Sequence, residues 1–187
     1  PAKPASFTAT MDAFGTLTFS VTDTTEFLVV KGRGLGLGAN TRNSSVAYDL
    51  SRTVTLNKVA YGYDLATTHM TSVEEQVPDF SSDPGLLEPG AVSEFERTFP
   101  GVPYAGTAGA HTKTTDLMGS TTLSLIQTSY TVLKNRSLQD TVITRSVTTN
   151  FDLTRSGSLQ RLDYDHDPET THLASARELP VALSELF

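Results

Sequence analysis

Apolar and polar residues alternate along several stretches of this chain, and such alternation predicts β-strands with one buried face. In residues 16–22, Leu17, Phe19 and Val21 share one side while Thr and Ser occupy the other. Similar alternation marks residues 46–63, 123–133, 142–153 and 158–164. Long strands that follow one another without helical crossovers favour antiparallel pairing. The pattern therefore predicts a mainly β fold, built as an antiparallel sheet, a barrel or a sandwich.

The alternation is interrupted at three places that predict local structure. After Asn57 the apolar residues change parity, which predicts a β-bulge. Residues 154–157 have the composition of a hairpin turn. Residues 31–38 contain four glycines but lack both a following helix and the Lys-Ser/Thr ending of a phosphate-binding loop. They predict a flexible loop between strands, or a strand that another segment approaches closely.

The end of the chain carries signals of a helix. Asp167-Pro168-Glu169 supplies an N-cap residue, a proline at the first helical position and an acid in the first turn. Apolar residues then recur at helical spacing. These features predict one C-terminal helix at about 168–180, so the expected fold class is β-rich α+β.

A long insertion at about 65–110 separates the two groups of strands. It contains five prolines, repeated glycines and little alternation, and connections of this length are uncommon unless they are functional or mobile. Val92, Phe95 and Phe99 predict one short amphipathic helical turn within it. We expect a single β-rich domain over residues 1–187, from which this insertion extends as an arm or a lid.

Composition narrows the possible classes of protein. The 187 residues include 29 Thr and 18 Ser, and Thr fits the pleated surface of a sheet better than a helix. This excludes a coiled coil or a helical bundle. The absence of Cys excludes disulfides, thiolate metal sites and a Cys nucleophile. No apolar run approaches the roughly 20 residues needed to span a bilayer, and no signal peptide is recognised, so a cytoplasmic or virion location is favoured.

The net charge of −7 is unevenly distributed. Residues 61–100 carry a net charge of −7 and residues 161–187 carry −4, whereas the predicted sheet is slightly basic. The chain is therefore a nearly neutral β body with two acidic attachments.

Two groups of side chains are candidates for ligand binding. Carboxylates at alternate positions suit a hard cation such as calcium, although an EF-hand would need Gly where Pro168 stands and Glu where Ala174 stands. The candidate calcium ligands are Asp163, Asp165, Asp167 and Glu169. Basic residues on predicted strands could contact phosphates along one sheet face. These candidate nucleic-acid contacts are Arg52, Lys58, Arg145 and Arg161.

No catalytic motif and no cofactor-binding motif is found, which favours a function without catalysis. The composition, the long strands and the insertion predict a structural protein that self-associates, such as a viral or phage coat or particle subunit. The alternative is a lipocalin-like barrel that binds a small molecule, or a barrel enzyme, with the insertion as a lid. Its cavity would be lined by Tyr48, Tyr61, Tyr63 and Tyr130.

Overall fold

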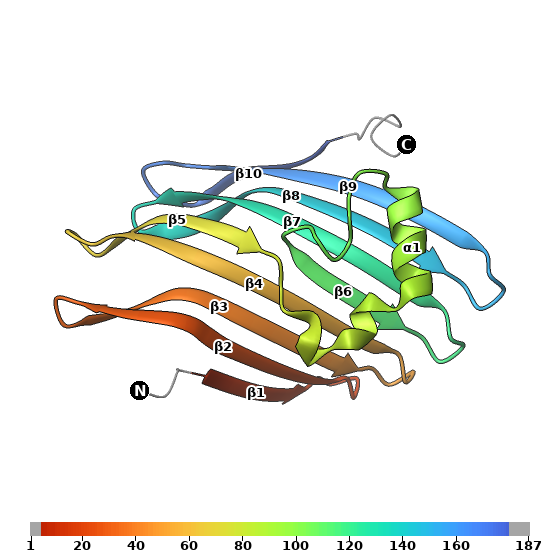
Figure 1. Cartoon of the computed structure of the whole chain (residues 1–187). Helices are drawn as coiled ribbons and strands as arrows, with labels where there is room; N and C mark the ends of the chain where they lie inside the picture. Colours follow the sequence, from red (N-terminus) through yellow and green to blue (C-terminus); the bar gives the residue numbers. More distant parts are fainter. Residues whose placement is uncertain (1–4, 180–187) are drawn as a thin grey trace.

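Residues 5–179 are described by the computed structural model, and they form one ten-stranded antiparallel sheet (Figure 1). The strands are β1 (Ala5–Met11), β2 (Leu17–Val30), β3 (Arg33–Val46), β4 (Arg52–Asp64), β5 (His69–Gln76), β6 (Ala110–Thr115), β7 (Thr121–Leu133), β8 (Arg136–Thr149), β9 (Arg155–His166) and β10 (Leu173–Leu179). Their order across the sheet is β1-β2-β3-β4-β6-β7-β8-β9-β10, and β5 pairs with the part of β4 that β6 leaves free. The predicted antiparallel β fold is confirmed, and the sheet is open because β1 and β10 lie at opposite edges.

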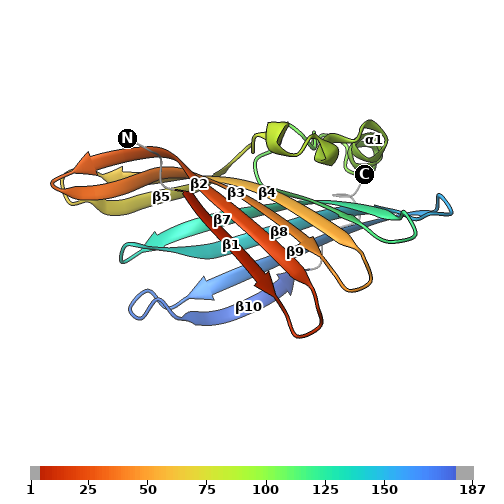
Figure 2. The same cartoon turned by 90° about the horizontal axis from the view of Figure 1, so that it is seen from below.

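One connecting segment, residues 77–109, covers part of one face of this sheet (Figure 2). It contains two short 3-10 helices, η1 (Phe80–Ser82) and η2 (Pro84–Leu87), and the α-helix α1 (Pro89–Thr98). We call this side the helix-bearing face and the opposite side the open face. No helix in the described part of the chain is long and apolar enough to cross a lipid bilayer.

The main hydrophobic core lies between this segment and the strands β7 and β8. Its buried members are Phe95, Phe99, Tyr104, Leu123, Leu125 and Val147. A second cluster joins Leu86 of η2 to Val54 and Leu56 of β4. Truncation of one such side chain typically costs about 2–5 kcal/mol, so residues 77–109 are part of the folded core. The segment expected to extend outward instead folds back on its own sheet, and the helical turn predicted around Phe95 is confirmed as α1.

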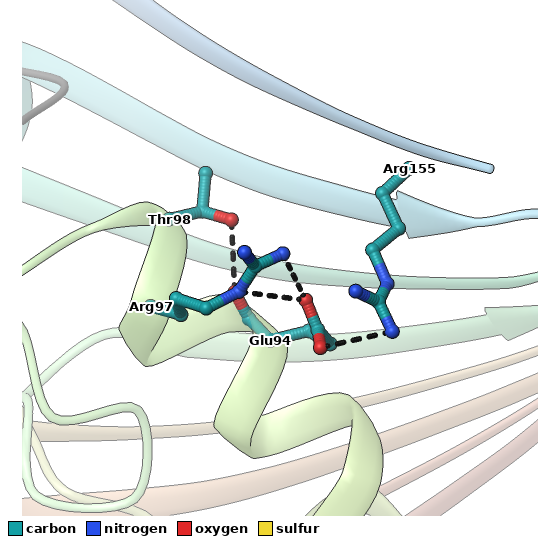
Figure 3. A network of polar contacts seen from close by, with 4 residues as sticks. All are labelled: Glu94, Arg97, Thr98 and Arg155. Atoms are coloured by element: carbon teal, nitrogen blue, oxygen red, sulfur yellow. Dashed lines mark hydrogen bonds and ion pairs between the residues drawn. The ribbon is translucent and has the colours of Figure 1, made fainter. Parts of the chain in front are cut away.

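Three ion pairs explain why the acidic segment lies on a slightly basic sheet. Arg42 contacts Asp83 at 2.8 Å, Lys113 contacts Glu88 at 2.6 Å, and Arg155 contacts Glu94 at 3.1 Å. Each pair joins a strand to the connecting segment. Figure 3 shows the last of them, in which Glu94 also accepts hydrogen bonds from the guanidinium of its helix neighbour Arg97. Partly exposed pairs of this kind contribute about 0–1 kcal/mol each, so they orient the segment while the apolar core holds it.

The predicted C-terminal helix is wrong within the described residues, because residues 173–179 form strand β10. The Asp167 carboxylate does accept hydrogen bonds from the backbone N–H groups of Glu169 and Thr170, as an N-cap would. Here those bonds close a turn, and Thr171 follows in the left-handed conformation, with φ of 62°. The same capping chemistry therefore serves a hairpin, and residue 180 lies outside the described part.

Two other local predictions are also corrected. The alternating stretch 46–63 is split by a turn at residues 47–51, where Leu50 has φ of 63°. The pairing of β4 with β3 continues without a shift past Asn57, so no bulge occurs there. The hairpin turn predicted at 154–157 lies slightly earlier, between β8 and β9, since β9 begins at Arg155.

The first five strands and the last five share one architecture. In both sets the strands follow chain order, and the fifth strand pairs with the distal part of the fourth. We call β1–β5 the first unit and β6–β10 the second unit. Left-handed backbone positions recur at matching places in the two units. The pairs are Gly15 and Gly119 (φ 84° and 89°), Lys31 and Lys134 (50° and 48°), Gly32 and Asn135 (76° and 64°), Leu50 and Leu153 (63° and 65°), and Thr68 and Thr171 (62° in both).

The amino-acid sequence repeats with the structure. Residues 5–24 align with residues 109–128, and residues 26–76 align with residues 129–179, with Thr25 left over where β2 is bulged. Identical residues occupy 24 of these 71 aligned pairs. Since turns, bulges and strand registers repeat at the same offsets, the chain contains two copies of one five-stranded unit.

Candidate interaction surfaces

Two rows of polar side chains cross the open face from β1 to β9. In register order, the first row is Thr10, Thr18, Ser45, Thr53, Thr114, Thr122, Thr148 and Ser156. The second row is Thr8, Ser20, Asn43, Thr55, Thr112, Ser124, Ser146 and Ser158. None of these side chains is charged, and in Figure 2 the connecting segment lies wholly on the opposite side of the sheet.

Hydroxyl groups in these rows bind one another across the strands. The Thr53 and Thr114 hydroxyls are 2.9 Å apart, and those of Thr55 and Thr112 are 3.0 Å apart. Further along the rows, Thr122 bonds to Thr148 and Ser124 to Ser146, both at 2.8 Å. These bonds fix the rotamers of the rows. Because affinity for nucleic acid rests on cations, a face without Lys or Arg in its rows gives phosphates little attraction.

An apolar strip is exposed on the helix-bearing face of the first unit. Its large members are Phe7, Met11, Leu17 and Phe19, which are 68%, 74%, 37% and 36% exposed. The rings of Phe7 and Phe19 stack with centroids 6.3 Å apart. In the second unit, the matching positions of the two aromatics are His111 and Leu123, which are 0% and 1% exposed under residues 77–109. The first unit thus displays a surface that the second unit buries.

The two free edges of the sheet differ in how they resist pairing. Charges, prolines and bulges usually protect an edge strand. Strand β1 has none of these, and all seven of its residues are exposed. At the other end, β10 carries Arg177 and Glu178 and is bulged near Leu173. It pairs only with residues 161–166 of β9, so residues 155–160 of β9 have no strand on that side within residues 5–179.

Four turns at one end of the sheet also present large apolar side chains. These side chains are Phe14, Tyr48, Leu50, Leu117, Met118, Phe151 and Leu153, each at least 63% exposed. In all four turns an aspartate carboxylate accepts backbone N–H groups, as Asp12 and Asp116 do at the matching turns of the two units. The apolar side chains are therefore held outward by a repeated turn structure.

One cleft lies on the helix-bearing face, where η1 meets strands β2 to β4. Its volume is about 280 Å³, and its walls include Val21, Leu56 and Pro78 beside the polar groups of Asn40 and Arg42. The Asn40 Oδ1 and Arg42 Nε atoms are buried without a hydrogen-bond partner in the described chain. This is an open cleft beside a sheet and not the lumen of a barrel.

The four candidate nucleic-acid residues share the helix-bearing face, as strand parity predicts, but they do not form one cluster. Arg52 and Lys58 lie on the same face of β4 as the buried Val54 and Leu56, whereas Arg145 and Arg161 lie on β8 and β9. Arg145 donates to the side-chain oxygen of Gln127. The Arg161 Nε donates to the Asp163 carboxylate at 2.9 Å. Arg145 and Arg161 are therefore each bound to a polar side chain of the sheet.

The four candidate calcium ligands lie along β9 and the turn after it. The hydrogen bond from Arg161 lowers the pKa of Asp163, and backbone N–H groups led by that of Glu169 lower the pKa of Asp167. No three acidic or histidine side chains in residues 5–179 come together in a way that could hold a metal ion. The first unit has Ala60, Gly62, Asp64 and Ala66 at the matching positions. Only the turn-closing aspartate is thus repeated.

His111 is a buried polar residue that strand periodicity alone did not single out. Its Nδ1 lies 3.0 Å from the Gly109 carbonyl oxygen and its Nε2 lies 2.6 Å from that of Tyr104. Burial lowers the pKa of His111 and raises that of the Tyr104 phenol. The two rings meet edge to face with centroids 4.7 Å apart. Alignment with Phe7 would have marked position 111 as one that can hold an apolar side chain.

Comparison with known proteins finds no matching family, no matching curated protein and no matching solved structure.

Proposed function

We propose that this protein is a structural subunit that self-associates. The observation that carries the proposal is the edge formed by β1, which has neither a charge nor a proline and adjoins the exposed side chains of Phe7 and Met11. Unpaired strand edges bind other strands through their backbone N–H and C=O groups. The partner that we propose for this edge is a second copy of the chain, as in the coat or particle of a virus or phage.

The exposed apolar strip supports the same proposal. Four large side chains on β1 and β2 lie together beside the connecting segment, and contiguous apolar patches of this kind mark interaction sites on soluble proteins. The repeated apolar turns add a second surface of the same character. A lipocalin-like barrel has less support, because the sheet is open and Tyr48, one of its predicted lining residues, is 85% exposed in a turn.

The test is the mass of the full chain in solution, measured by sedimentation and light scattering over a wide concentration range. We expect species larger than the 20.1 kDa chain. Ala9→Lys places a charge on the β1 edge and should raise the concentration needed for association at least tenfold, equivalent to about 1.4 kcal/mol. The matched control, Ala174→Lys on the already charged β10 edge, should change it little. A wild-type protein that stays monomeric at every concentration would overturn the proposal.

A further inference from the structure

We infer that copies of the chain join head to tail, with β1 of one copy pairing with residues 155–159 of β9 in the next. This rests on the proposed self-association and specifies its interface. The basis is the internal repeat, since the junction between the two units inside one chain already shows how the end of one unit receives the start of another.

The internal junction is the pairing of β4 with β6. It joins five residue pairs, from Arg52 with Thr115 to Leu56 with His111. Strand β6 is the first strand of the second unit, and it occupies the half of β4 that β5 does not reach. On the open face, this junction is closed by the two hydroxyl pairs of the polar rows.

Both halves of this junction occur a second time in the chain, and there neither has a strand on its outer side within residues 5–179. Strand β1 is the equivalent of β6, and residues 155–159 are the equivalents of residues 52–56. In the same register, the pairs between copies are Met11 with Arg155, Thr10 with Ser156, Ala9 with Gly157, Thr8 with Ser158, and Phe7 with Leu159. Hydroxyls would again meet hydroxyls on the open face, and Phe7 would meet an apolar partner on the helix-bearing face.

A second contact of the internal junction has equivalent residues at the two ends of the sheet, where the Glu178 Oε1 accepts a hydrogen bond from Gln160 Nε2 at 3.1 Å. The Glu75 carboxylate of β5 accepts a hydrogen bond of 2.7 Å from the backbone N–H of Thr128 in β7. Both residue types are repeated, as Glu178 in β10 and Thr24 in β2. Across the proposed interface, Glu178 of one copy lies beside Thr24 of the next, so the contact that joins the two units can form again.

The direction of the strands makes this association heterologous. Each unit has five antiparallel strands in the same order, so β1 and β6 run the same way and present the same face. A contact between copies that repeats the relation between the two units adds each new copy at the same end of the sheet. Such assemblies close into rings or extend as filaments, according to the rotation between copies. The two polar rows end at β1 and β9, and they would continue unbroken from copy to copy.

Cysteine pairing tests the register directly, because the chain has no cysteine of its own. Thr8→Cys and Ser158→Cys are made as separate full-length variants and mixed under mild oxidation. We expect a disulfide-linked dimer of twice the 20.1 kDa chain mass in the mixture and none in either variant alone. The double variant Thr55→Cys with Thr112→Cys is the positive control and should close within one chain, because those hydroxyls are 3.0 Å apart. A mixture of Ala9→Cys with Ser158→Cys is the negative control, since these side chains lie on opposite faces.

The outcomes separate the inference from the proposed function. A linked dimer from Thr8→Cys alone would show two-fold pairing of β1 with β1 and would overturn the head-to-tail inference. Association by light scattering without a Thr8–Ser158 disulfide, while the Thr55–Thr112 control closes, would overturn the inference and leave self-association in place. A chain that remains monomeric would overturn both.

Discussion

The two units have related sequences but different surroundings, and their comparison shows what decides burial in this molecule. Phe19 and Leu123 occupy matching positions on β2 and β7, and both side chains face the helix-bearing side. Phe19 is 36% exposed, whereas Leu123 is 1% exposed because α1 and Tyr104 pack over it. An apolar residue on one face of a strand thus marks a surface that requires a cover, and the connecting segment covers only one of the two such surfaces.

The largest expected difference between the units is in core energetics. Leu123→Ala should lower the free energy of unfolding by about 2–5 kcal/mol, because it leaves a cavity under α1. Phe19→Ala should lower it by only about 1 kcal/mol in the monomer, since its side chain is partly in water already. Urea denaturation at a concentration where the chain is monomeric measures both. Equal losses at the two sites would show that the first unit is covered in the monomer.

An effect of intermediate size on stability is expected at His111. Its counterpart in the first unit, Phe7, cannot titrate. His111→Phe leaves the carbonyls of Tyr104 and Gly109 without their imidazole partner, at a cost of about 1–3 kcal/mol. The pKa of His111 is lowered in the folded state by burial, so the unfolded chain takes up the proton first. Stability should therefore fall as pH drops below the ordinary histidine value of about 6.5.

Unfolding of the wild type and of His111→Phe at pH 7.5 and pH 5.5 isolates this dependence. The variant should lose less stability than the wild type over that interval. Phe7→Ala serves as the control and should retain the pH dependence of the wild type. If the wild type and His111→Phe respond equally to pH, the histidine does not titrate as its burial requires.

The smallest expected effect concerns the polar rows. Thr55→Val removes a hydroxyl whose partner is Thr112, and such a hydrogen bond contributes about 0.5–1 kcal/mol. Ser158→Ala, at the matching position on β9, removes a hydroxyl on the open face of a strand that has no outer partner there within residues 5–179, and it should leave monomer stability nearly unchanged. Thermal unfolding of both variants tests the contrast. A larger loss in Ser158→Ala would mean that the β9 edge is already engaged within the monomer.

The strands were predictable because a strand with one covered face alternates apolar and polar residues. In β2, for example, Leu17, Phe19 and Val21 share one face. The C-terminal helix was mispredicted because Asp167-Pro168-Glu169 has a capping chemistry that helices and turns share. The matching turn at Asp64 lacks the proline and keeps the same Asp, Thr, Thr and His spacing. Comparison of the two turns would therefore have favoured a hairpin.

The position of the connecting segment could not be read from local pattern at all. Its prolines and glycines are typical of a mobile connection, and its net charge indicated only that it differs from the sheet. Tertiary contacts determine where this segment lies. Phe95 and Phe99 pack in the apolar core on the sheet, and Glu94 forms an ion pair with Arg155 of β9. The interaction surfaces were equally hidden, because polar rows across many strands appear only when the registers are known.

The internal repeat, by contrast, was present in the sequence as identities at an offset of about one hundred residues.

Residues 77–109 also act as a tether between the two units. A tether keeps the first strand of the second unit at a high effective concentration near β4, so that junction forms at any dilution. The proposed junction between copies has similar chemistry but no tether, and its occupancy must depend on how much protein is present. Dilution would therefore release folded two-unit chains and never single units. The connecting segment sets the smallest piece into which such an assembly can come apart.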